Sequence, residues 1–101
     1  MTHLVVNELF VESGDVEEFE RNFVASMKGT LAAVDGLVHA RLVAPRTEGR
    51  GYLSVLEFVD HAAYARYLES EAFAAAHMWP DHAPFSHNQL AEFETRFELG
   101  G

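Results

Sequence analysis

The hydrophobic positions follow two periods, one typical of β-strands and one typical of helices. Segment 3–12 is rich in Val, Leu and Phe and is predicted to be a strand. Successive side chains of a strand point to opposite faces. One face therefore carries Val5, Asn7, Leu9 and Val11. The other face carries Leu4, Val6, Glu8 and Phe10. Both faces are largely apolar, so we expect both to be covered.

Apolar residues then recur at helical spacing and predict an amphipathic helix over 16–34. The residues of this stripe are Val16, Phe19, Phe23, Met27, Leu31 and Val34. Asp15, followed three residues later by Glu18, resembles a capping box with Asp in place of Ser or Thr. Gly36 suits the end of the helix.

Three more strands are predicted. Segments 37–44 and 52–59 are joined by the turn-rich loop 45–51 and are expected to form a hairpin. Segment 88–99 alternates throughout, with Phe93 and Phe97 on its apolar face, and predicts a long closing strand.

Two short helices are expected between the hairpin and the closing strand. Asp60 can cap a helix over 61–68, and Ser70 can cap another over 71–78. Pro80 follows and does not continue a helix.

The resulting order, β-α-β-β-α-β, is the ferredoxin-like split βαβ arrangement of the α+β class. Helices would cover one face of a four-stranded antiparallel sheet. The 101 residues leave nothing to cover the second face. We therefore predict a homodimer with two sheets facing each other, and one domain over residues 1–101.

The composition of the chain argues against some classes of binding partner and some cellular locations. The net charge of −9 argues against nucleic acid and anionic membranes as partners. No apolar run approaches the roughly 20 residues that span a bilayer, and the N-terminus does not have the features of a signal peptide. The absence of Cys excludes disulfides and Cys-ligated metals, and it favours a cytoplasmic protein.

Asn7, Tyr67 and His77 are the polar residues with candidate chemistry. An Asn within an apolar strand face needs partners for its amide, and a buried Tyr hydroxyl needs one too, although both are more often structural than functional. His77 near a helix end can be a metal or haem ligand, or a general base. It can also be a polar cap whose protonated form interacts favourably with the helix dipole.

Other types of site have little support in the sequence. His77, His82 and His87 are spaced by five, which does not place them on one helix face as a preformed zinc site requires. His3, His39 and His61 have no recognisable chemical context. The chain has no Gly-rich phosphate loop, and no flavin or nicotinamide site is readable.

Four segments resemble one known family: "VVNELFVESGDVEEFERNF", "YLSVLEF", "YLESEAFAAAH" and "LAEFETRFEL". They are similar to the antibiotic biosynthesis monooxygenase (ABM) superfamily of dimeric α+β barrels, over residues 3–99. The likeness is greatest to its haem-degrading monooxygenases of the IsdG type. That group has an Asn in the first strand, an aromatic residue on the second helical region and a His ten residues later, which correspond to Asn7, Tyr67 and His77.

The resemblance implies roles for these residues. His77 would be the axial ligand of the haem iron, and Asn7 would donate a hydrogen bond on the distal side. Tyr67 would stand where the family's Trp presses on the porphyrin, and Phe23 would pack near the macrocycle. Haem would be both cofactor and substrate, and an external electron donor would be needed.

Two differences from the family keep other functions open. Tyr67 replaces the larger Trp, and Asn22 and Ser26 stand on the first helix where relatives carry basic residues. One alternative is a cofactor-independent monooxygenase of quinol or polyketide-like aromatic substrates. The other is a non-catalytic dimer that binds haem or a small apolar ligand.

Overall fold

The structure, a computed structural model, describes residues 2–71, 73 and 87–100. It contains four strands, β1 (His3–Phe10), β2 (Leu37–Val43), β3 (Tyr52–Phe58) and β4 (His87–Glu94). A short 3-10 turn, η1 (Ser13–Asp15), precedes the helix α1 (Val16–Thr30), and a second helix, α2 (His61–Leu68), follows β3. The predicted α+β class and the order of elements are confirmed.

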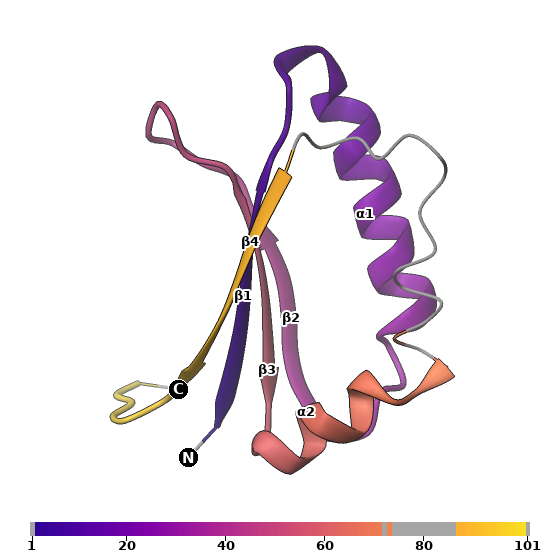
Figure 1. The fold of residues 1–101 in the computed structure, drawn as a ribbon, viewed down its shortest axis with the longest axis vertical. Coiled ribbons are helices and arrows are strands. Elements are labelled where there is room, and N and C mark those ends of the chain that lie inside the picture. Colours follow the sequence, from indigo (N-terminus) through magenta and orange to yellow (C-terminus); the bar gives the residue numbers. More distant parts are fainter. Residues whose placement is uncertain (1, 72, 74–86, 101) are drawn as a thin grey trace.

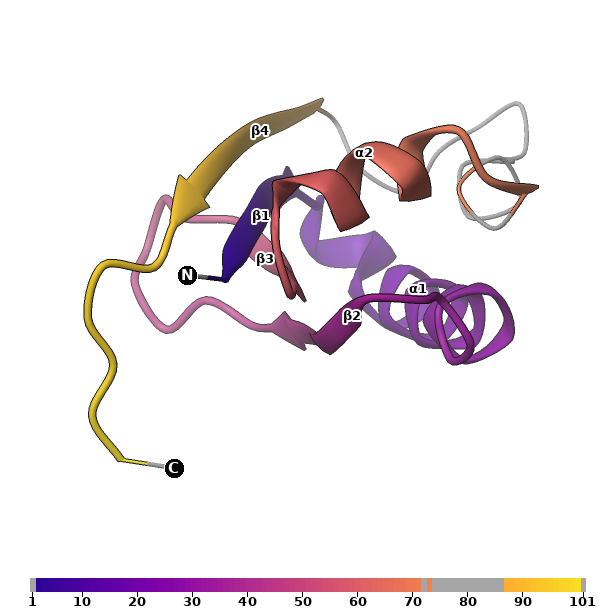
Figure 2. The ribbon, with the colours of Figure 1, turned by 90° about the horizontal axis from the view of Figure 1, so that it is seen from below.

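The strands form one antiparallel sheet in the order β2-β3-β1-β4, so β1 lies between β3 and β4. Both helices lie on the same side of this sheet, α1 along its length and α2 across one end (Figure 1). In the view from below, no helix of the described residues lies on the opposite face of the sheet (Figure 2). We call the helix-covered side the inner face and the other side the outer face.

Alternation along β1 agrees with the predicted faces. Val5 and Leu9 are 4% and 1% exposed and point to the inner face, where two hydrophobic clusters form the core. The first cluster is built on Phe58 and includes residues of α2, and the second is built on Phe19 of α1. These clusters hold the two helices against the sheet.

The predicted closing strand is too long at its C-terminal end. β4 stops at Glu94, which pairs with His3, the first residue of β1. One more bond, from Thr95 N to Thr2 O at 3.0 Å, follows the strand. The alternating pattern continues beyond Glu94 although the strand does not, and Phe97 and Leu99 are 78% and 87% exposed.

Helix ends differ in how well their caps were predicted. Asp60 caps α2 as expected, since its Oδ1 accepts a hydrogen bond from Ala63 N at 2.8 Å. Ser70 Oγ likewise accepts one from Phe73 N at 3.1 Å. The capping box at Asp15 is wrong, because that residue occupies the N-cap position of α1 with no side-chain hydrogen bond to the helix.

Two further predicted helix boundaries can be compared with the structure, the end of α1 and the helix expected after Ser70. Helix α1 ends at Thr30, four residues earlier than predicted, and the chain passes through turns before β2. The predicted helix over 71–78 lies mostly outside the described residues. Among the described residues, no helix is long and apolar enough to cross a membrane.

Candidate functional site

Asn7 lies in the middle of the inner face of β1. Its neighbours on that face, Val5 and Leu9, are buried, and Asn7 itself is half-buried. Its register partner on β3 is Ser54, a polar residue that is buried. Opposite partners share a face, so a short polar strip interrupts the apolar inner face at this point.

Tyr67 lies in the first hydrophobic cluster, on the side of α2 that faces the sheet. It is 5% exposed, and its ring centroid lies 5.5 Å from that of Phe58 and 5.5 Å from that of Phe73. Burial, and secondarily the neighbouring Tyr64, raises the pKa of Tyr67 above its usual value. The side chain is therefore a neutral phenol near pH 7, which suits it to hydrogen bonding and ring contact rather than to proton abstraction.

Phe23 lies on α1 and packs against the second hydrophobic cluster. It is half-buried, and its ring centroid lies 5.3 Å from that of Phe19. Phe19 in turn lies 5.0 Å from Tyr52 of β3, edge to face. An aromatic surface thus extends from α1 to the sheet.

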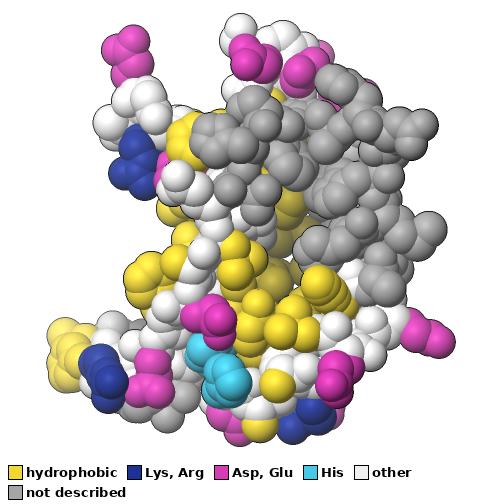
Figure 3. Space-filling view, in the orientation of Figure 1, with side chains coloured by type: hydrophobic (Ala, Val, Ile, Leu, Met, Phe, Trp, Pro, Cys, Tyr) yellow, Lys and Arg dark blue, Asp and Glu magenta, His cyan; other side chains and the backbone are white. Residues whose placement is uncertain are grey.

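The structure brings three of the four predicted site residues to the same side of the sheet. Asn7 stands between Val5 of the first cluster, which contains Tyr67, and Leu9 of the second, against which Phe23 packs. The fourth residue, His77, lies outside the described residues. Hydrophobic side chains gather in a hollow beside the sheet (Figure 3).

The charges around this side are mostly negative. On α1, Arg21 and Lys28 are exposed, together with three acidic residues, Glu17, Glu18 and Glu20. The carboxylate of Glu20 accepts a hydrogen bond from the Tyr52 hydroxyl. That bond, with smaller effects of burial and of the negative charge, raises the pKa of Tyr52 to about 12.

An ion pair fixes the hairpin loop to β1. Arg50 donates to both oxygens of Glu8, at 2.9 and 3.2 Å, and Gly51 N donates to the same carboxylate at 2.9 Å. The hydrogen bond to Glu8, followed by its charge, raises the pKa of Arg50. This pair lies on the outer face, away from Asn7, and orders the loop rather than the candidate site.

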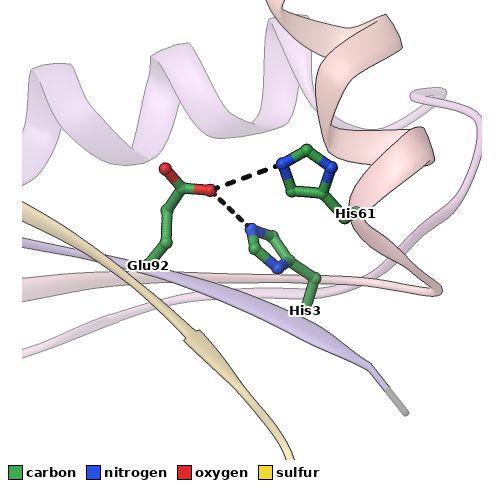
Figure 4. A group of neighbouring side chains, drawn as sticks. All are labelled: His3, His61 and Glu92. Carbon is green, nitrogen blue, oxygen red and sulfur yellow. Dashed lines mark hydrogen bonds and ion pairs between the residues drawn. The ribbon is translucent and has the colours of Figure 1, made fainter.

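One polar group was missed by the sequence reasoning. His3, His61 and Glu92 converge from β1, α2 and β4, and they lie side by side (Figure 4). His3 and Glu92 are separated by 89 positions, so no local motif connects them. Only the register of β1 against β4 could have indicated that they meet.

Comparison with known proteins gives a family match over most of the chain. The profile of the family described as "Antibiotic biosynthesis monooxygenase" matches residues 2–79. A search of curated proteins gave no match.

Solved structures of the same fold cover nearly the whole chain. A mutant of MhuD with two manganese protoporphyrin IX molecules per active site is 22% identical, with 98% of this chain and 99% of that one covered and a TM-score of 0.84. The haem degrader MhuD from Mycobacterium tuberculosis, with two haems bound, is 21% identical, with 97% and 99% covered and a TM-score of 0.81.

SnoaB from Streptomyces nogalater, described as a cofactor-independent oxygenase, shares the fold as well. Its mutant is 22% identical, with 97% of this chain and 96% of that one covered and a TM-score of 0.72. At these identities the structures establish the fold, and the same fold occurs in a haem degrader and in a cofactor-independent oxygenase.

Proposed function

The chain belongs to the antibiotic biosynthesis monooxygenase family, and on that premise we propose that it is a haem-degrading monooxygenase that binds haem as cofactor and substrate. The observation that carries this proposal is the position of Asn7 between two aromatic-containing clusters on the inner face. A single amide N–H in apolar surroundings interacts strongly with a bound oxygen molecule, because water competes less there.

The residues around Asn7 suit a flat apolar ring. Tyr67 offers a buried aromatic face and a neutral hydroxyl, and Phe23 offers a second ring from α1. His77 follows α2 in sequence and is proposed as the ligand of the haem iron, a role that a neutral imidazole fills in many haem proteins. When bound, the haem would supply the iron that activates dioxygen and the carbon that is oxidised.

The charge of α1 favours a second candidate, a cofactor-independent monooxygenase of aromatic substrates. Haem carries two propionates, and α1 offers only Arg21 and Lys28 against its three Glu residues. A neutral phenolic substrate would meet no such repulsion. In that case Asn7, Tyr67 and His77 would orient a substrate that itself reduces dioxygen.

Haem titration distinguishes the two candidates. We expect purified protein to give a shifted Soret band that saturates at one haem per chain, and His77→Ala to abolish the shift. His39→Ala is the matched control, because His39 is an exposed histidine on β2, and its spectrum should equal the wild type. If the protein forms no haem complex but takes up dioxygen when a hydroquinone is added, the first candidate function is wrong and the second is supported.

We also propose that the protein is a homodimer joined through the outer face. Register partners place an apolar set on that face, namely Leu4, Val6, Val43, Leu53, Val55, Ala91 and Phe93. Such a surface without a helix over it is typical of an interface between subunits.

Sedimentation measurements test the dimer. The wild type is expected at twice the mass of the chain, and Val55→Asp is expected to be a monomer, because it places a charge at the centre of the apolar face. Val24→Asp, at an exposed apolar position of α1, should leave the dimer intact. A monomeric wild type would refute the proposal. Equal sedimentation masses for Val55→Asp and Val24→Asp would also refute it.

A further inference from the structure

Three side chains from distant parts of the chain form a compact group at one end of the inner face (Figure 4). His3 Nε2 lies 2.8 Å from Glu92 Oε1, and His61 Nε2 lies 3.9 Å from the same oxygen. One ligand atom from each residue lies within 4.8 Å of the others. In the space-filling view, histidine and acidic side chains are adjacent at the margin of the apolar hollow (Figure 3).

We propose that His3, His61 and Glu92 form a binding site for a first-row divalent cation, with Zn²⁺ as its best fit. Two imidazole nitrogens and one carboxylate oxygen are a donor set that zinc uses where a water completes its coordination. Imidazole donors select such cations over Mg²⁺ and Ca²⁺, which prefer oxygen ligands.

The distances require only small side-chain rotations. Zinc bonds of about 2.0–2.2 Å place tetrahedral donors about 3.4 Å apart. The 2.8 Å pair must therefore open slightly, and the 3.9 Å pair must close by a similar amount. The nitrogens of His3 and His61, which lie within 4.8 Å of each other, must approach by at most about 1.4 Å. A cation at the centre would exchange the hydrogen bond between His3 and Glu92 for two coordinate bonds.

The three residues differ in mobility in a way that suits such a site. The His3 side chain is 11% exposed, and its ring lies 5.3 Å from that of Tyr64, so it is a fixed ligand. Glu92 and His61 are 44% and 71% exposed and can adjust their rotamers. Exposure of these two also leaves a path for the cation and a position for water or a small anion.

The site would connect three elements that lie apart in the sequence, namely β1, α2 and β4. His3 begins β1, His61 begins α2, and Glu92 lies on β4, one of the two edge strands of the sheet. A cation held by all three would tie β4 and α2 to the central strand and stabilise the folded protein. This inference does not depend on the proposed oxygenase activity, because none of the three residues belongs to the candidate haem site.

Calorimetric titration of chelator-treated full-length protein, purified without a histidine tag, tests the site. ZnCl₂ is expected to bind at one ion per chain, and His61→Ala and Glu92→Gln are each expected to weaken that binding at least about 10-fold. Both positions are partly exposed, so these variants should keep the fold, which circular dichroism checks. His39→Ala, at an exposed histidine of β2, should bind as the wild type does.

A second readout is the melting temperature. ZnCl₂ at a concentration that saturates the wild type should raise it in the wild type and in His39→Ala, and should raise it less in His61→Ala. Absence of zinc binding in the wild type would overturn the proposal. Zinc binding of equal affinity in wild type, His61→Ala and Glu92→Gln would also overturn it, since the ion would then be held elsewhere.

Discussion

Gly36 controls how closely α2 packs against the start of β2. Its φ of +83° is in the left-handed region, and its carbonyl accepts a hydrogen bond from Val59 N at 2.8 Å. A Cβ added at Gly36 would lie 2.6 Å from the Cβ of Ala63, which is completely buried on α2. We therefore predict that Gly36→Ala destabilises the protein through both the backbone and the packing.

The two contributions can be separated with Gly49. Gly49 has nearly the same φ, +85°, but an added Cβ there would meet no atom within 4 Å. The left-handed backbone costs an Ala residue about 1–2 kcal/mol at either position. Overpacking against Ala63 adds about 1–3 kcal/mol at Gly36 alone. We expect losses near 3 kcal/mol for Gly36→Ala and near 1 kcal/mol for Gly49→Ala.

Urea unfolding followed by circular dichroism measures both losses. For a domain of this size, each kcal/mol lowers the melting temperature by about 4 °C or more, so the variants should also melt well apart. Protein concentration is kept fixed, because a dimer's stability depends on it. Equal losses in the two variants would refute the argument, since they would show that α2 yields to the added methyl group at no cost.

Three further predictions concern single side chains. Asp60→Ala should lose about 1 kcal/mol of unfolding free energy, because the cap on Ala63 N disappears, and Asp60→Asn should recover most of it. Phe58→Ala should lose about 3–5 kcal/mol in the same urea assay, because a fully buried ring is removed. The raised pKa of Tyr52, about 12, means that folded protein keeps a proton that unfolded protein releases above pH 10. The free energy of unfolding should therefore fall as the pH rises from about 10 to 12. The fall should be smaller in Tyr52→Phe, which has no hydroxyl to titrate. An equal fall in the wild type and in Tyr52→Phe would show that the bond to Glu20 does not contribute.

The order of elements and most of their bounds could be predicted because each segment has a clear period. The match is close for α2, predicted over 61–68 and found at His61–Leu68. Alternation alone could not locate the end of β4, because Phe97 continues the pattern although the pairing with β1 ends at Glu94. Asp15 ends the 3-10 turn and is the N-cap residue of α1, but its side chain makes no capping hydrogen bond, although the sequence supported one.

The candidate site was predictable in part. Periodicity assigned Asn7 to the same strand face as Val5 and Leu9, and the structure agrees. The grouping of Asn7, Tyr67 and His77 came from the family resemblance, and their roles remain predictions. The group of His3, His61 and Glu92 could not be predicted, because it depends on strand register and on the start of α2.

The oxidation of bound haem tests the proposed function most directly. The one-to-one complex is mixed with a reductant, with and without dioxygen, and the Soret band is followed over time. The account predicts that the band disappears only with dioxygen and that iron is released. It also predicts that Asn7→Ala, which removes the amide donor, slows the loss by on the order of 10²-fold while haem still binds. A Soret band that persists in the wild type under dioxygen and reductant would contradict the account.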